Sequence, residues 1–116
     1  MTVKRIVANI ATDDIGRANA FYEELLGLRL VMDLGFIATF AADGKMTPQI
    51  GIATEGGSGT LVPDLSIEVD DVDEVHRRAV EKGLTIEYGP VNEPWNVRRF
   101  YTRDPFGRLV NILMHL

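Results

Sequence analysis

The chain has 116 residues and a net charge of −5 at pH 7, and it contains no cysteine. The missing cysteines exclude disulfides, thiolate metal sites and a cysteine nucleophile, and the acidic balance argues against a nucleic-acid partner, because affinity for phosphate backbones needs clustered cations. No stretch approaches the roughly 18 apolar residues of a membrane helix, and the N-terminus lacks a signal-peptide pattern, so we expect one cytoplasmic domain over residues 1–116 with no membrane partner.

The first half of the chain predicts a strand, a helix and three further strands. Residues 6–11 alternate in the way that is typical of a strand with one buried face. An aspartate pair at 13–14 can cap the helix that follows, and apolar residues at helical spacing lead to Gly27, a natural left-handed helix end. Strand-like runs then cover residues 28–34, 35–42 and 48–54.

The second half repeats this pattern after a linker. The stretch EGGSGTLVP at 55–63 is rich in glycine and ends in proline, which predicts a linker at about 56–63. Residues 10–15 read IATDDI and residues 67–72 read IEVDDV, so a strand end and an aspartate pair recur about half a chain later. A second helix should end at Gly83, and further strands are predicted over 84–91, 97–103 and 107–114.

These elements predict two βαβββ modules, at about 1–55 and 64–116, in an α+β fold with mixed sheets and two helices. One module is too small to bury its own sheet and helix. The modules are therefore expected to pair, and we expect a homodimer.

Three stretches carry a family resemblance: residues 14–28, residues 67–72 and residues 103–107. Together they resemble the vicinal oxygen chelate superfamily, which includes glyoxalases, bleomycin-resistance proteins and extradiol dioxygenases. The resemblance implies two modules that form a curled mixed sheet around a cleft, with the helices on the outer face. Residues 93–107 look most similar to the bleomycin-resistance branch, which implies sequestration of an antibiotic.

The resemblance also implies where a metal would bind. Members of the superfamily usually hold one divalent metal with His, Gln and Glu side chains. In this sequence the corresponding positions fall near Val7, at Asp64 and at Asn111, and Gln49 could add a fourth. Valine cannot coordinate, and neutral amides are poor ligands for transition metals. We therefore predict no metal cofactor, with Gln49, Asp64 and Asn111 as candidates only if a divergent site exists.

The turn at 104–107 determines which residues should face the cleft. If four residues form this turn, Arg103 opposes Arg108 and Phe100 opposes Asn111. Arg99 and Tyr101 then face the opposite side and take structural roles. This arrangement predicts a ligand-binding set made of Trp95, Arg98, Phe100, Asn111, Asp64, Glu68 and Asn9.

Simpler interpretations exist for several of these residues. Trp95 could pack in an interface, and Arg98 and Glu68 could pair only with each other. Asp70 and Asp71 are expected to cap a helix, and Asp104 to stabilise a turn. His76 and His115 are expected to be ordinary surface or core-edge histidines.

The sequence therefore predicts a metal-free small-molecule-binding protein for an aromatic or cationic, antibiotic-like ligand. Stacking and charge can supply such binding. No nucleophile and base are adjacent in the predicted strands, but catalysis stays open. The alternative is a lyase, isomerase or dioxygenase with one divalent metal at a divergent site, and a third option is an accessory domain with a vestigial cleft.

Overall fold

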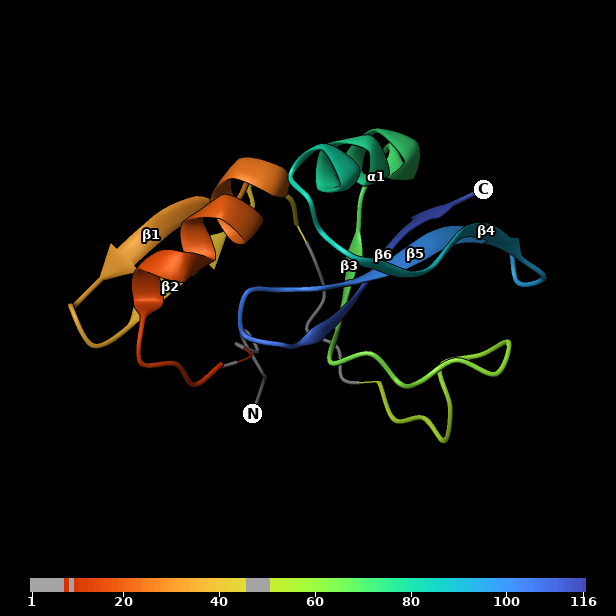
Figure 1. Ribbon diagram of the computed structural model, residues 1–116, viewed down its shortest axis with the longest axis horizontal. Helices are drawn as coiled ribbons and strands as arrows, with labels where there is room; N and C mark the ends of the chain where they lie inside the picture. The colour runs from red at the N-terminus through yellow and green to blue at the C-terminus, as the bar shows by residue number, and fades with distance from the viewer. Residues whose placement is uncertain (1–7, 9, 46–50) are drawn as a thin grey trace.

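The computed structural model describes residue 8, residues 10–45 and residues 51–116, and it has an α+β fold (Figure 1). Its elements in chain order are η1 (Ile15–Ala18), η2 (Asn19–Leu25), β1 (Arg29–Asp33), β2 (Ala38–Ala41), β3 (Leu65–Glu68), α1 (Val72–Glu81), β4 (Ile86–Glu93), β5 (Val97–Arg103) and β6 (Leu109–His115). The predicted combination of two helical segments with mixed sheets is confirmed.

The second half of the chain forms the predicted βαβββ unit. Its four strands lie in the order β3-β6-β5-β4, with β3 parallel to β6 and the other pairs antiparallel. The Asp71 carboxylate accepts the backbone N–H of Glu74 at 3.1 Å and caps α1, as predicted. The helix is followed by Gly83 at φ +78°, a conformation that side chains disfavour.

The first helical region differs from its prediction in detail. A short 3-10 helix, η1, runs directly into a π-helix, η2. Asp14 stands at the N-cap position, but its side chain makes no capping hydrogen bond. The tight first turn is closed instead by the backbone, where Arg17 N–H donates to the Asp14 carbonyl at 3.4 Å. The expected cap by this aspartate is therefore wrong.

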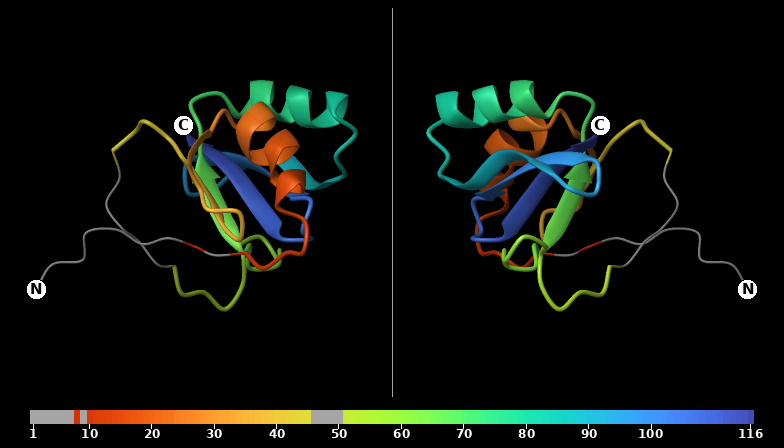
Figure 2. Two further views of the ribbon diagram at one scale, coloured as in Figure 1. Left: turned by 90° about the vertical axis from the view of Figure 1, so that its left-hand side faces the viewer. Right: turned by 90° about the vertical axis from the view of Figure 1, so that its right-hand side faces the viewer.

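Both helical segments pack on one face of the four-stranded sheet. In Figure 2, η2 and α1 lie on the same side of β5 and β6. Phe100, Val110 and Ile112 are fully buried beneath them. Removing such side chains from water stabilises the fold by about 1.5–3 kcal/mol each. The helical partners in this core are Ala18, Phe21, Tyr22, Leu25, Val72, Val75 and Ala79.

The first half of the chain supplies the antiparallel pair β1–β2, as predicted for two of its strands. The predicted strand at 48–54 falls partly outside the described residues, and residues 51–54 have no strand conformation. Most of the predicted strand at 6–11 also lies outside them, and residues 8, 10 and 11 are not in a strand. The division into modules at 1–55 and 64–116 stays a prediction. Within the described residues, no helix is long and apolar enough to cross a membrane.

Candidate functional site

The connection between β5 and β6 is longer than the sequence pattern suggested. Arg103 pairs with Leu109, so residues 104–108 form the loop. Asp104 shapes this loop: its Oδ1 accepts the backbone N–H groups of Phe106 at 2.9 Å and Arg108 at 2.8 Å. Its predicted role in the turn is confirmed. The extra residue shifts the register by one, and in a strand a one-residue shift exchanges the two faces.

This shift corrects the predicted orientation of Arg98 and Phe100. Phe100 pairs with Ile112 and is fully buried on the helix side, with its ring centroid 5.3 Å from that of His76. Arg98 also lies on that side and binds the Asp73 carboxylate of α1 at 2.9 Å. Neither side chain shares a face with Asn111, and Arg98 does not pair with Glu68.

The opposite face of the sheet gathers a second, polar set of side chains. We call it the polar face. Ser66 of β3 and Tyr101 of β5 flank Asn111 of β6 in register. The Asn111 amide donates to Ser66 Oγ at 3.1 Å, while its buried Oδ1 has no partner among the described residues. The members of the polar face used below are Asp64, Ser66, Glu68, Tyr88, Glu93, Arg99, Tyr101 and Asn111.

The remaining predicted site residues occupy different positions relative to this face. Asp64 and Glu68 are exposed at its β3 edge. Asp64 accepts the backbone N–H of Leu109 at 2.8 Å, and Glu68 contacts the imidazole of His115 at 2.8 Å. Trp95 lies between β4 and β5 and is 47% exposed. Asn9 lies outside the described residues.

Arg99 is the centre of the polar face, and the sequence argument placed it on the wrong side. Its side chain is nearly completely buried. One terminal nitrogen donates to the Gly56 carbonyl at 2.9 Å and the Tyr101 hydroxyl at 3.0 Å, and the other donates to the Gly57 carbonyl at 3.2 Å. Its Nε is buried without a partner among the described residues. The predicted orientation of Arg99 and Tyr101 is therefore wrong, because both lie on the same face as Asn111, and their structural role stays a prediction.

Three aromatic rings surround the Arg99 guanidinium. Its carbon lies 5.0 Å from the ring centroid of Tyr101, 5.2 Å from that of Trp95 and 5.4 Å from that of Tyr88. All three distances are within the range of a favourable cation–π interaction. The rings therefore stabilise the charge of a guanidinium that water cannot reach.

Glu93 supplies the counter-charge from the end of β4. Its Oε2 lies 3.8 Å from Arg99 and accepts the Ser58 hydroxyl, and its Oε1 accepts the Tyr88 hydroxyl at 2.5 Å. Burial by itself would raise the pKa of Glu93. The two hydroxyl hydrogen bonds and the Arg99 charge outweigh burial, so the pKa is lowered from its ordinary value and the carboxylate stays ionised at neutral pH.

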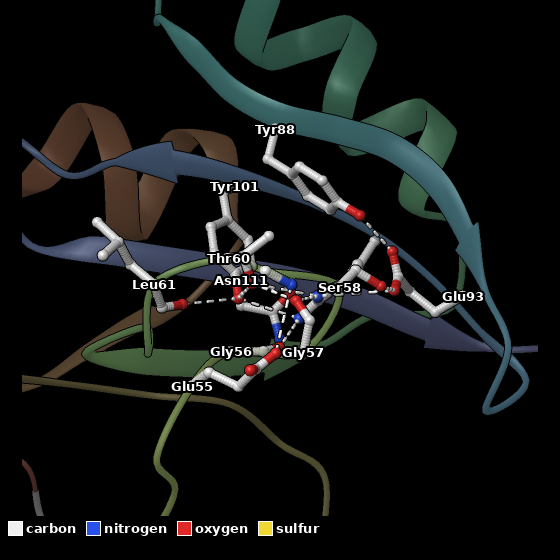
Figure 3. A network of polar contacts seen from close by, with 12 residues as sticks. Glu55, Gly56, Gly57, Ser58, Thr60, Leu61, Tyr88, Glu93, Tyr101 and Asn111 are labelled. Atoms are coloured by element: carbon white, nitrogen blue, oxygen red, sulfur yellow. Dashed lines mark hydrogen bonds and ion pairs between the residues drawn. The ribbon is translucent and has the colours of Figure 1, made fainter.

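Part of the predicted linker covers the polar face. Residues 56–61, here called the strap, lie on the side of the sheet away from α1 (Figure 1). Thr60 Oγ1 contacts the Tyr101 hydroxyl at 3.1 Å, and the same hydroxyl donates to the Leu61 carbonyl at 3.1 Å. Figure 3 shows the strap against Tyr101 and Glu93, with Asn111 beside it. Of the hollows found in the described part, one lies by η2 and α1 and another by η1 and β1–β2, so neither is on this face.

Among the described residues, the candidate metal ligands do not form a divalent-metal site. Gln49 lies outside the described residues, and the Asp64 carboxylate already accepts a backbone N–H. Asn111 offers one free oxygen, which is neutral, and the guanidinium of Arg99 on the same face disfavours a second cation. In the described ranges, no three His, Asp or Glu side chains come together in a way that could hold a metal ion. The described residues therefore do not by themselves fit a resident divalent metal.

The amino-acid sequence matches a family of known proteins over nearly its whole length. The profile of the Glyoxalase/Bleomycin resistance protein/Dioxygenase superfamily matches residues 3–112. The chain belongs to this superfamily. This assignment confirms the resemblance drawn from the three sequence stretches, at the level of the superfamily.

Individual proteins of known sequence or structure are also similar to this chain. The chain is 36% identical over 102 residues to the anthracycline biosynthesis protein DauV of Streptomyces sp. (strain C5), and this alignment covers 84% of the chain. The chain spans only 36% of the length of that relative. TioX from Micromonospora sp. ML1 is 24% identical with a TM-score of 0.68, over 96% of this chain and 95% of that chain. TnmS3, an antibiotic binding protein from Streptomyces sp. CB03234, is 22% identical with a TM-score of 0.69, over 100% and 97%. At these identities the two structures show a shared fold.

The sequence argument missed Tyr88, Glu93, Arg99 and Tyr101 as members of one polar cluster. A usable signal existed for two of them. Arg99 and Tyr101 alternate with the apolar core residue Phe100, and a five-residue loop would have placed them beside Asn111. The contacts of Arg99 with the strap carried no such signal, because they join residues about forty positions apart.

Proposed function

We propose that this protein binds an aromatic small molecule on the polar face without a metal, and that the face forms one wall of a cleft between two βαβββ modules. The observation that carries this proposal is the position of Trp95. Trp95 is half exposed and its ring contacts the buried Arg99 guanidinium and Gly57, so the exposed part of the ring can stack on a flat ligand while the rest is held in place.

The chemistry of the face supports binding rather than metal-dependent turnover. Asn111 has a free acceptor oxygen, and Asp64 and Glu68 are exposed carboxylates at the β3 edge that can pair with an amine of the ligand. An aromatic floor with few polar groups is typical of small-molecule sites. The relatives favour an antibiotic as the ligand: TnmS3 is an antibiotic binding protein, and DauV acts in anthracycline biosynthesis. An anthracycline is accordingly the first probe to use.

We expect Trp95→Ala to weaken binding of an anthracycline roughly tenfold, which corresponds to a loss of about 1.4 kcal/mol of stacking energy. Isothermal titration calorimetry of the wild type and the variant measures this. Arg98→Ala is the matched control, because Arg98 lies three residues away but on the helix side, where it binds Asp73. Equal losses for the two variants would place the ligand elsewhere.

We also propose that two chains pair, as the small size of each module predicts. Exposed apolar surface along β1 and the turn that follows it supports this proposal, because patches of this kind often mark interfaces. Sedimentation equilibrium should give twice the mass of one chain, and a single-chain mass over the whole concentration range would contradict it. The exposed side chains are Leu30, Val31, Met32, Leu34 and Phe36.

A further inference from the structure

The strap supplies backbone carbonyl oxygens that accept hydrogen bonds from the Arg99 guanidinium. Arg99 is 3% exposed, and the oxygens that its two terminal nitrogens meet at the strap are the carbonyls of Gly56 and Gly57 and the Thr60 hydroxyl. A guanidinium is a fixed fork of five donors. A backbone carbonyl has the same acceptor chemistry as a ketone, quinone or amide oxygen of a small molecule. The strap thus presents to Arg99 the kind of group that an oxygenated ligand would present.

With the strap in place, two buried polar atoms on the polar face have no hydrogen-bond partner among the described residues. They are the Nε donor of Arg99 and the Oδ1 acceptor of Asn111. The two residues stand diagonally across β5 and β6, so they are about 7–8 Å apart and their Cβ atoms are somewhat closer. An unpaired buried polar group is unfavourable. A ligand acceptor would satisfy the Arg99 Nε, and a ligand donor would satisfy the Asn111 Oδ1.

The strap is held mainly by polar contacts that a ligand could replace. Leu61, its largest apolar side chain, is exposed, and residues 57–59 all have positive φ. The strap's apolar contact is with Trp95, whose ring lies directly on Gly57. Segments with few buried apolar contacts open at low free energy. Opening the strap would leave Arg99, Tyr101 and Trp95 accessible on the same face.

We infer that the strap occupies the ligand position on the polar face, and that an aromatic ligand bearing a carbonyl oxygen displaces it to accept hydrogen bonds from Arg99. This inference rests on the proposed small-molecule binding and names the ligand class: a planar ring with a carbonyl or similar acceptor oxygen. The apparent affinity then equals the intrinsic affinity multiplied by the fraction of molecules in which the strap is open.

A single substitution can displace the strap without altering the sheet. A Cβ atom at Gly56 would clash with the Leu61 carbonyl oxygen and the Thr60 hydroxyl inside the strap and with the Tyr101 hydroxyl of the sheet, so Gly56→Ala disrupts the closed strap and its contact with Tyr101. Gly59→Ala is the matched control in the same segment, because a Cβ there has no atom within 4 Å. The control still carries the strain of alanine at φ +75°.

We expect Gly56→Ala to bind the anthracycline at least about tenfold more tightly than wild type, because the closed strap no longer competes. Gly59→Ala should bind within about twofold of wild type. Calorimetry measures the affinity, and amide hydrogen exchange at Thr60, whose N–H donates to the Gly57 carbonyl at 3.0 Å, reports whether the strap has opened. If Gly56→Ala does not fold, Thr60→Val loosens the strap by removing one hydroxyl, and a smaller gain of about threefold is expected.

Each outcome decides between the two proposals. Tighter binding by the opened variant, with faster exchange at Thr60, supports displacement. Binding that is unchanged or weaker in an opened variant overturns displacement and leaves the proposed function intact, because the ligand then binds with the strap in place. If neither wild type nor opened variant binds the probe, the proposed function fails, and this inference fails with it.

Discussion

Replacing Arg99 with methionine is expected to lower the free energy of unfolding by about 3–5 kcal/mol, the usual effect of leaving a buried charge without its partner. Methionine keeps an unbranched apolar stem like that of arginine but lacks the guanidinium that lies among Trp95, Tyr88 and Tyr101. The Glu93 carboxylate, however, loses the cation at 3.8 Å in a position that water hardly reaches. The strap also loses the donor that its carbonyls accept from. Urea denaturation measures the change.

Arg98→Met is the control for this experiment, because it removes the same side chain from the neighbouring position. The Arg98–Asp73 pair is partly exposed and is expected to contribute less than about 1 kcal/mol. Adding Glu93→Gln to Arg99→Met should recover part of the lost stability, since it removes the stranded charge. If Arg99→Met and Arg98→Met destabilise equally, Arg99 is not the centre of the polar face.

Replacing Asp104 with alanine is expected to destabilise the protein by about 3–5 kcal/mol, because three hydrogen bonds to one buried carboxylate are lost. Two of them fix the β5–β6 loop through the N–H groups of Phe106 and Arg108. The third comes from the Tyr22 hydroxyl of η2 at 2.6 Å and joins the helix to the hairpin. Burial and this carboxylate raise the pKa of Tyr22, so the hydroxyl remains a donor at neutral pH.

Two further variants separate the roles of Asp104 in the same denaturation assay. Tyr22→Phe removes only the bond to η2, and a loss of about 1–2 kcal/mol is expected. Asp104→Asn keeps an acceptor for the loop N–H groups and should fall between Tyr22→Phe and Asp104→Ala. A loss below 1 kcal/mol for Asp104→Ala would show that the loop does not depend on this side chain for its length or register.

Local patterns in the sequence were enough to predict the helix and strands of the second half of the chain and to identify the superfamily. Periodicity and the Asp71 cap define α1, and alternating residues define β4, β5 and β6, because these features depend on neighbours along the chain. The repeat of the aspartate motif led to the superfamily that the profile match shows. The orientations of the candidate residues were predicted only in part: Asn111 lies beside Ser66 on a polar face, whereas Arg98 and Phe100 lie on the helix side.

The tertiary structure decided the register of β5 against β6, and with it the composition of the site. The alternation of residues is the same for either loop length, so the sequence pattern could not choose between them. The side chain of Asp104 stabilises the five-residue loop, and with it the observed register, because it accepts two backbone N–H groups of that loop. Likewise, composition identified residues 56–61 as part of a linker, but only folding brought their carbonyls to Arg99. Contacts between residues distant in the chain produce no periodic pattern in the sequence. The partners of the Arg99 guanidinium could therefore be identified only from the tertiary structure.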